Sequence, residues 1–107
     1  MQTEFKFRNL ESSDTLKSYA TDKLGKLQKY LKAPLQAQVT FGIEAHLHCV
    51  DVSLSAGGEH HLGRAEEEDM YAAIDVVVDK MQRQINRTNS QHKNHRRGPQ
   101  PDGGAGE

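Results

Sequence analysis

The sequence of 107 residues lacks tryptophan and has one cysteine, three prolines and no long apolar run. Its single thiol, Cys49, forms no internal disulfide and cannot alone hold a structural zinc ion, which normally takes four ligands. A membrane-spanning helix needs about 20 apolar residues in succession, and the amino end alternates phenylalanine with charge, unlike a secretory signal. We therefore expect a cytoplasmic protein without a membrane span, of a length that suits one domain.

Motifs for catalysis are also missing. The chain has neither a glycine-rich phosphate loop nor a serine in a glycine-flanked turn. Asp75 and Asp79 are four residues apart and so share one helix face, but we expect that face to lie opposite the core and the pair to be solvated. The sequence predicts a protein that is not an enzyme and that uses no cofactor and no small-molecule substrate.

The apolar residues that are present follow two periods. Phe5 and Phe7 alternate with charged residues, as in a half-buried strand, whereas the leucines between residues 14 and 31 recur at helical spacing. Pro34 cannot continue that helix. Gly57–Gly58 suits a tight hairpin turn, and Asp69 offers a carboxylate that can cap a second helix.

Six elements are predicted from these patterns. They are a strand at Gln2–Arg8, a helix at Asp14–Leu31, strands at Ala37–Ile43, Leu47–Ser55 and His60–Ala65, and a helix at Asp69–Thr88. Their order indicates an α+β fold, a two-layer sandwich in which two helices cover one face of a four-stranded sheet. The other sheet face carries polar residues such as Lys6 and Thr40 and should meet water. We assign residues 1–90 to the folded domain and expect 91–107, basic at first and then rich in Gly and Pro, to be a disordered tail.

The net charge of −1 conceals a separation of sign along the chain. Every charged residue from Glu66 to Asp79 is acidic, whereas Lys80–Arg97 holds no Asp or Glu. On a helical wheel, basic residues of both predicted helices border the apolar faces and form two ridges. Such ridges match the phosphates of a nucleic-acid backbone, although a solvated helix face is the ordinary alternative. The ridges consist of Lys23, Lys26 and Lys29 on the first helix and Lys80, Arg83 and Arg87 on the second.

Histidine is also frequent in this sequence, with six residues. His46 and His48 lie two apart on a predicted strand and would share a face close to Cys49, and imidazole pairs suit zinc, nickel or copper. A structural zinc site needs more ligands at short spacing, so we favour exposed histidines and no metal site. A histidine-dependent metal-binding protein is kept as an alternative.

The most specific motif is the run Asp69–Asp75 (DMYAAID), followed by the basic residues of the second helix. Together with Lys23–Leu31 (KLGKLQKYL) and Gly57–Gly58, it resembles the ribosome hibernation promoting factor family, bacterial ribosome-associated inhibitors of translation, in its short form. The resemblance extends over Met1–Lys93. It implies a β-α-β-β-β-α fold, in agreement with the order of elements above.

The resemblance implies a function by occlusion. The protein would bind the small ribosomal subunit, alone or in the whole ribosome, in the channel that messenger and transfer RNA use, and would inhibit translation in stationary phase or under stress. The free protein would be a monomer. Tyr71 is expected to contact RNA or a partner, whereas Gly42 and Ala45 stand where members often carry Lys. The residues implied in binding ribosomal RNA are Lys23, Lys26, Lys29, Lys80, Arg83, Arg87 and Lys93. A general double-stranded RNA-binding module, which would read an A-form groove by shape, is a second alternative.

Overall fold

The computed structural model describes the backbone of residues 1–97 and the side chains of residues 1–89. Its elements are β1 (Gln2–Arg8), α1 (Asp14–Gly25), the 3₁₀ helix η1 (Lys26–Tyr30), β2 (Gln36–Glu44), β3 (Leu47–Ala56), β4 (Glu59–Glu67) and α2 (Met70–Arg97). The predicted α+β class and the order β-α-β-β-β-α are confirmed. No helix within the described residues is long and apolar enough to cross a membrane.

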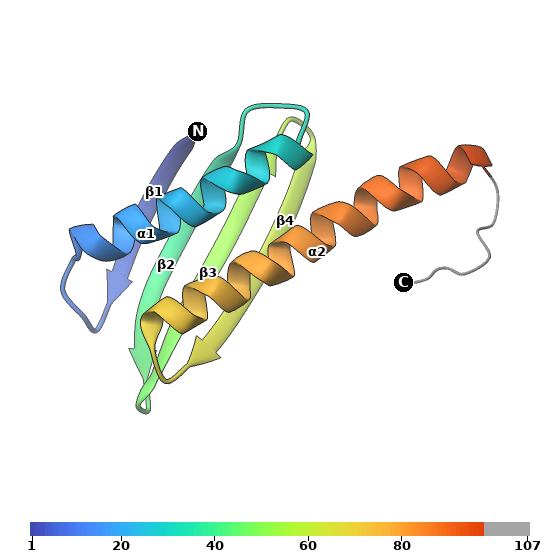
Figure 1. Ribbon diagram of the computed structural model, residues 1–107. Coiled ribbons are helices and arrows are strands. Elements are labelled where there is room, and N and C mark those ends of the chain that lie inside the picture. The colour runs from blue at the N-terminus through green and yellow to red at the C-terminus, as the bar shows by residue number, and fades with distance from the viewer. Residues whose placement is uncertain (98–107) are drawn as a thin grey trace.

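The four strands form one mixed sheet in the order β1-β2-β3-β4. β1 runs parallel to β2, and the hairpins β2-β3 and β3-β4 are antiparallel. α1 and η1 make the crossover between the parallel strands β1 and β2. α1 and α2 lie side by side over the same face of the sheet (Figure 1). On the opposite face, Lys6 is exposed and Thr40 is half-buried, which confirms that this face meets water.

The core fills the space between the sheet and the two helices. Phe41 of β2 is fully buried, and its ring stacks on Phe5 and Phe7 of β1 with centroids 6.0 and 5.0 Å apart. Burying a large apolar side chain contributes roughly 1.5–3 kcal/mol, so the buried apolar side chains of the sheet and the helices account for much of the stability of the fold. The helices supply Leu16, Ala20, Leu24, Leu27, Met70, Ile74, Val77, Met81 and Ile85.

α2 lies close to the edge strand β4. A Cβ at Gly63 would collide with Met81 Sδ and would lie 3.2 Å from Val77 Cγ2, so only glycine allows this approach. Gln84 Nε2 donates a hydrogen bond of 2.6 Å to the main-chain oxygen of Leu62. The side chains of α2 thereby occupy backbone groups that an edge strand otherwise leaves open.

The first predicted helix, Asp14–Leu31, is divided in the structure. The α-helix ends at Gly25 and continues as the 3₁₀ helix η1. Glycine is a weak helix former, and a tighter last turn is a common way for a helix to end. Gln28 then holds the connection to β2, because its Nε2 donates to Ala33 O at 2.8 Å and its Oε1 accepts from Leu35 N at 2.7 Å.

The second helix is longer than predicted. The expected end was Thr88, but α2 continues to Arg97. No glycine or proline interrupts residues 89–97, and the first such pair is Gly98–Pro99, so nothing in the covalent structure stops the helix earlier. Residues 91–97, which the sequence assigned to the tail, therefore belong to the helix. The disorder expected further on falls at 98–107, outside the described residues.

The turn between β2 and β3 consists of Ala45 and His46, both with positive φ, of 47° and 73°. The prediction that His46 shares a strand face with His48 is therefore wrong, because β3 begins only at Leu47. The predicted strands leave residues 44–46 as a connection, but neither Ala45 nor His46 is one of the usual glycine, asparagine or aspartate residues that mark a two-residue hairpin turn.

Candidate nucleic-acid interface

The cations predicted on the first helix come from two successive elements. Lys23 is near the end of α1, and Lys26 and Lys29 belong to η1. The helix starts at Ser13, whose hydroxyl oxygen accepts a hydrogen bond of 3.2 Å from Leu16 N, a typical amino-terminal cap. Burial of Leu16 and the following leucines fixes the rotation of the helix, and all three lysines then border the same side, facing α2.

A groove of about 320 Å³ runs between η1 and α2. Its floor is apolar, formed by Leu27, which is buried, and by Val78, which packs against the core. Lysines stand along the wall from α1 and η1, and oxygen acceptors stand along the wall from α2. The lining residues are Lys23, Lys26, Leu27, Lys29, Tyr30, Asp75, Val78, Asp79 and Gln82.

A network around Asp75 joins the two helices. The hydroxyl of Tyr19 donates a hydrogen bond of 2.7 Å to Asp75 Oδ1, and Lys23 Nζ lies 4.0 Å from the same oxygen. The ammonium of Lys23 is also 5.3 Å from the centroid of the Tyr19 ring. The hydrogen bond to Asp75 raises the pKa of Tyr19, because only the protonated phenol can donate it. Asp75 is exposed as predicted, but it faces the groove and not a separate solvated face.

Gln82 is a groove residue that the sequence did not single out. Its Nε2 donates to the hydroxyl of Tyr30 at 3.2 Å and so bridges α2 to η1. Lys29 Nζ lies 5.3 Å from the centroid of the Tyr30 ring. The only signal in the sequence is the spacing, since Gln82 follows Asp79 by three residues and therefore falls on the same side of the helix.

The second predicted ridge lies outside the groove, and its three cations have different surroundings. Lys80 Nζ donates a hydrogen bond of 2.9 Å to the main-chain oxygen of Arg64, so this side chain reaches toward β4. Arg83 pairs with Asp79 at 3.0 Å, one helical turn earlier, and Arg87 is exposed. The structure therefore brings Lys23, Lys26 and Lys29 together along the groove and leaves the α2 cations on its outer side.

Two further residues implied in binding have different positions. The ring of Tyr71 meets that of Tyr19 edge to face, with centroids 5.0 Å apart, and the residue is 37% exposed. Tyr71 thus packs at the crossing of α1 and α2 and still offers part of its ring to a ligand. Lys93 belongs to α2, and its side chain lies outside the described residues.

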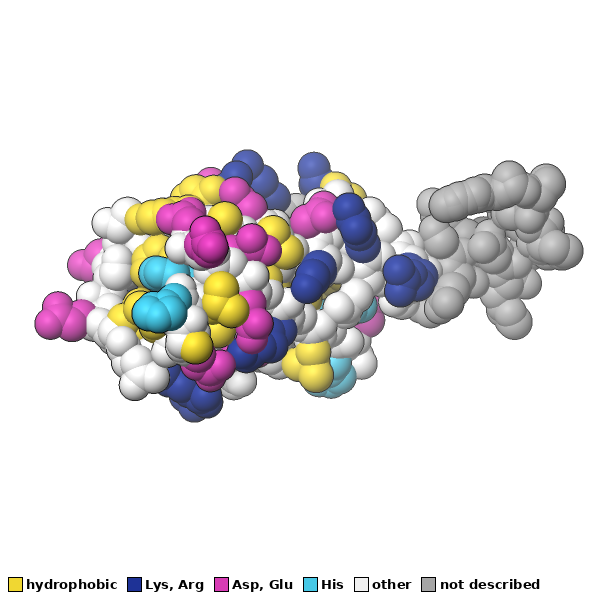
Figure 2. Space-filling view, turned by 90° about the horizontal axis from the view of Figure 1, so that it is seen from below, with side chains coloured by type: hydrophobic (Ala, Val, Ile, Leu, Met, Phe, Trp, Pro, Cys, Tyr) yellow, Lys and Arg dark blue, Asp and Glu magenta, His cyan; other side chains and the backbone are white. Residues whose placement is uncertain are grey.

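The surface seen in Figure 2 shows how charge is distributed on one side of the molecule. Dark blue lysine and arginine side chains follow α2 toward its carboxyl end, whereas magenta acidic side chains gather nearer the other end. The separation of sign seen along the sequence is thus also a separation in space.

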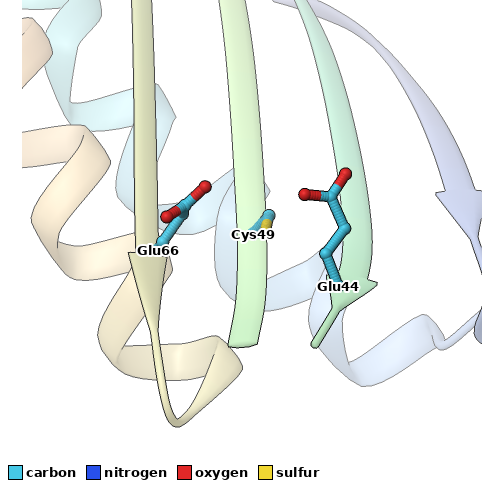
Figure 3. Close-up of side chains that lie close together, drawn as sticks. All are labelled: Glu44, Cys49 and Glu66. Carbon is cyan, nitrogen blue, oxygen red and sulfur yellow. The ribbon is translucent and has the colours of Figure 1, made fainter. Parts of the chain in front are cut away.

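One group of possible metal ligands occurs among the described residues, formed by Glu44, Cys49 and Glu66 on three adjacent strands (Figure 3). Their ligand atoms lie within 4.8 Å of one another. Arg64 already engages both carboxylates, at 2.8 Å from Glu66 and 3.6 Å from Glu44. Burial, followed by the charge of Glu44, raises the pKa of the Cys49 thiol and keeps its proton on. The arrangement is therefore an ion-pair cluster beside a protonated thiol, which is a poor cation site.

The alternative of a histidine-dependent metal site finds no support in this geometry. His46 is in the β2-β3 turn, and His48 alternates with Cys49 along β3, so the imidazole and the thiol point to opposite faces of the sheet. Within residues 1–89, the group of three potential ligands contains no histidine.

Comparison with known proteins points to one family. A family model described as sigma 54 modulation protein / S30EA ribosomal protein matches residues 3–93. The ribosome hibernation promoting factor of Salmonella typhimurium is 38% identical over 96 residues, which are 89% of this chain and 100% of that protein. The protein of the same name from Escherichia coli K12 is 36% identical over the same shares.

Solved structures agree with this assignment. The crystal structure of the N-terminal domain of Thermus thermophilus Protein Y matches with a TM-score of 0.76 and 28% identity, over 82% of this chain and 99% of that chain. A ribosomal subunit interface protein from Coxiella burnetii, at 19% identity and a TM-score of 0.74, shares the fold over 84% of this chain and 99% of that chain.

Proposed function

We propose that this chain, which belongs to the sigma 54 modulation protein / S30EA ribosomal protein family, inhibits translation. It would do so by binding the small ribosomal subunit in the channel that messenger and transfer RNA use. Membership makes the protein a ribosome-associated factor. The site on the ribosome and the block of translation are the proposal. Its relatives are named as hibernation promoting factors, which supports a role in stationary phase or stress, and a ribosome-bound factor works in the cytoplasm.

The observation that carries this proposal is the set of unpaired cations on the helix layer. Among the described side chains, no carboxylate lies within 4.0 Å of Lys26, Lys29 or Arg87, whereas Lys23 and Arg83 have acidic neighbours. A cation without an internal partner is free to neutralise a phosphate and release its counterions. The lysines of the first ridge line the groove, and the cations of the second ridge lie on the outer side of α2, so a folded RNA surface would contact both by extending across α2.

The chemistry of these residues suits recognition of shape more than of sequence. Lysine acts as a point charge, and arginine adds bidentate contacts to phosphate oxygens. Contacts of this kind fix the position of a protein on nucleic acid without reading bases. The binding residues proposed are therefore Lys23, Lys26, Lys29, Arg83 and Arg87, with Lys80 and Lys93 continuing the α2 ridge and Tyr71 at the helix crossing.

The test is sedimentation of the protein with small subunits and with whole ribosomes at two salt concentrations. The variant Lys26→Glu/Lys29→Glu reverses two groove cations, and the matched control Lys6→Glu/Arg8→Glu makes the same charge change on the open sheet face. A charge-assisted contact contributes roughly 1.5–3 kcal/mol, so the first variant should lose about 100-fold or more in affinity. The control should bind the ribosome nearly as tightly as the original chain.

The outcomes separate this proposal from its rival. Salt-sensitive binding to the small subunit that the groove variant loses and the control keeps supports it. Binding to free duplex RNA as tight as binding to ribosomes would favour a general double-stranded RNA-binding module instead. Equal losses in the two variants would contradict an interface on the helix layer, since net charge alone would then explain the effect.

A further inference from the structure

We propose that the groove between η1 and α2 is a binding site for a single unstacked guanine nucleotide. This inference rests on the proposed function and goes further, because it adds readout of a base to the binding of phosphates. It follows from the opposite chemistry of the two groove walls and from the apolar floor between them.

The wall formed by α2 accepts hydrogen bonds. Asp75 uses Oδ1 in its contact with Tyr19, and Asp79 uses Oδ2 in its contact with Arg83. Within the described residues, the second oxygen of each carboxylate accepts no side-chain hydrogen bond. Gln82 uses one N–H of its amide to donate to Tyr30, so its carbonyl oxygen is the acceptor it can offer to a ligand, beside one remaining N–H.

The wall formed by α1 and η1 has the reverse character. Lys23, Lys26 and Lys29 line it, and an ammonium group is donor only and positively charged. Between the walls, Leu27 and Val78 form an apolar floor suited to a flat ring. A matching ligand therefore has hydrogen-bond donors on one edge, an apolar planar body, and an anionic group on the side of the lysines.

Guanine is the nucleobase that best fits these requirements. Its N1–H and N2–H groups are adjacent donors that point the same way, so one carboxylate can accept both, as it accepts the fork of arginine. Adenine and cytosine place an acceptor beside their amino group, and uracil places its only N–H between two carbonyls, so each would set an acceptor against the carboxylate wall. The phosphate of the same nucleotide then meets the lysines.

The size of the groove agrees with one nucleotide. A volume of about 320 Å³ lies at the lower end of the roughly 300–1,000 Å³ of small-molecule sites. Unpaired bases in loops and bulges are the parts of RNA that proteins read on their Watson–Crick edges. A guanine nucleotide in an RNA strand and a free guanine nucleotide share this chemistry, and the experiment distinguishes them.

The test measures fluorescence anisotropy of a short labelled oligouridylate with one central guanosine, adenosine or inosine. The original chain should bind the guanosine RNA about tenfold more tightly than the adenosine RNA, the scale of one bidentate contact to a base. Inosine lacks the N2 amino group and should fall between them. Competition with free GMP and AMP distinguishes a free nucleotide from a nucleotide within RNA. If GMP displaces the labelled RNA and AMP does not, a free guanine nucleotide suffices as the ligand. If neither displaces it, the site recognises guanine only within an RNA strand.

The variant Asp79→Asn tests the carboxylate wall. It keeps the size of the side chain, removes one negative charge, and should abolish the preference for guanosine while adenosine RNA binds as well as before or better. Asp22→Asn is the matched control, since Asp22 is exposed on α1 and does not line the groove, and it should keep the preference. Thermal unfolding of both variants shows whether they remain folded. If Asp79→Asn does not fold, Asp75→Asn takes its place as the test of the carboxylate wall.

Failure of this inference differs from failure of the proposed function. Equal affinities for guanosine and adenosine RNA, with ribosome binding still lost in Lys26→Glu/Lys29→Glu, would overturn the guanine site and leave ribosome binding standing. A guanosine preference that Asp79→Asn retains would also overturn it, because the base would then be read elsewhere. A guanosine preference in a chain that does not sediment with ribosomes would support the site and contradict the proposed function.

Discussion

Both faces of the molecule carry cations, and on each face the fold pairs some of them and leaves others unpaired. Lys6 and Arg8 on the open sheet face have no carboxylate within 4.0 Å among the described side chains, whereas Arg64 on the same face is paired. On the open sheet face, Arg64 lies 2.7 Å from Asp51 and 2.8 Å from Glu66, and these two carboxylates raise its pKa. On the helix layer, Lys26 and Lys29 have no carboxylate within 4.0 Å among the described side chains. A face binds an anionic partner through charges that the fold has not already neutralised, so counting basic residues alone does not locate an interface.

The close contact between β4 and α2 is the place where a single substitution should have the largest effect on stability. Gly63 faces α2 and its neighbour Leu62 faces the open side, where it is 70% exposed. Gly63→Val should lower the free energy of unfolding by about 3 kcal/mol, because its side chain would overpack against Met81 and Val77. Urea unfolding of the purified variant measures this change.

Leu62→Ala is the control on the opposite face of the same strand. An exposed side chain should change stability by no more than about 0.5 kcal/mol. If Gly63→Val were as stable as the original chain, α2 would not lie as close to β4 as the structure has it. A large loss in Leu62→Ala would instead show that the open face is covered in solution.

A smaller effect is expected when the helix-layer cations are neutralised rather than reversed. Lys26→Gln/Lys29→Gln should make the dependence of log affinity for the ribosome on log salt shallower by roughly 1.4–1.8, since each phosphate contact contributes about 0.7–0.9. Lys6→Gln/Arg8→Gln on the open face should leave the slope unchanged. Equal slopes in the three proteins would place Lys26 and Lys29 away from RNA.

The sequence predicted the architecture well because burial on one face leaves a simple pattern. The alternation around Phe5 and Phe7 and the cap at Asp69 give the same elements in the structure, and Asp69 Oδ2 accepts from Ala72 N at 2.9 Å. The ends of helices were harder to predict. The change to a 3₁₀ helix follows Gly25, a weak helix former, but Leu24, Leu27 and Leu31 stay buried across it, so the periodicity of the leucines does not reveal the change.

The geometry of the candidate site was predicted only in part, because sequence periodicity describes one element at a time. A helical wheel shows which residues share a side of one helix, but not what the neighbouring element presents to them. It placed Lys80 with Arg83 and Arg87, and could not show that Lys80 reaches the backbone of β4. It also could not show that Asp75 would face the lysines of another helix across a groove.

Substitutions in the two hairpin turns should change the free energy of unfolding by about 1 kcal/mol, in opposite directions. At the β3-β4 turn, Gly57 takes the positive φ of 63°, whereas at the β2-β3 turn Ala45 and His46 take it. The double variant Ala45→Asn/His46→Gly should stabilise the protein by about 1 kcal/mol, because asparagine and glycine tolerate this backbone. Gly57→Ala should destabilise it by about 1 kcal/mol, since a Cβ there is strained and lies 3.2 Å from Ala33 Cβ. Thermal unfolding of both variants checks these opposite signs.

The smallest effect concerns the exposed network that joins α1 to α2. The hydrogen bond to Asp75 raises the pKa of Tyr19, so its contribution to stability is fully present below the ordinary tyrosine pKa of 10.0 and is lost as the pH rises through the raised value. The melting temperature should therefore fall less steeply above pH 10.0 in Tyr19→Phe than in the original chain. Tyr71→Phe is the matched control, because the Tyr71 hydroxyl makes no hydrogen bond within residues 1–89, and its pH dependence should equal that of the original chain. If Tyr19→Phe also kept the full dependence, the alkaline loss would come from other groups, and the contact between Tyr19 and Asp75 would not hold the two walls of the groove together in solution.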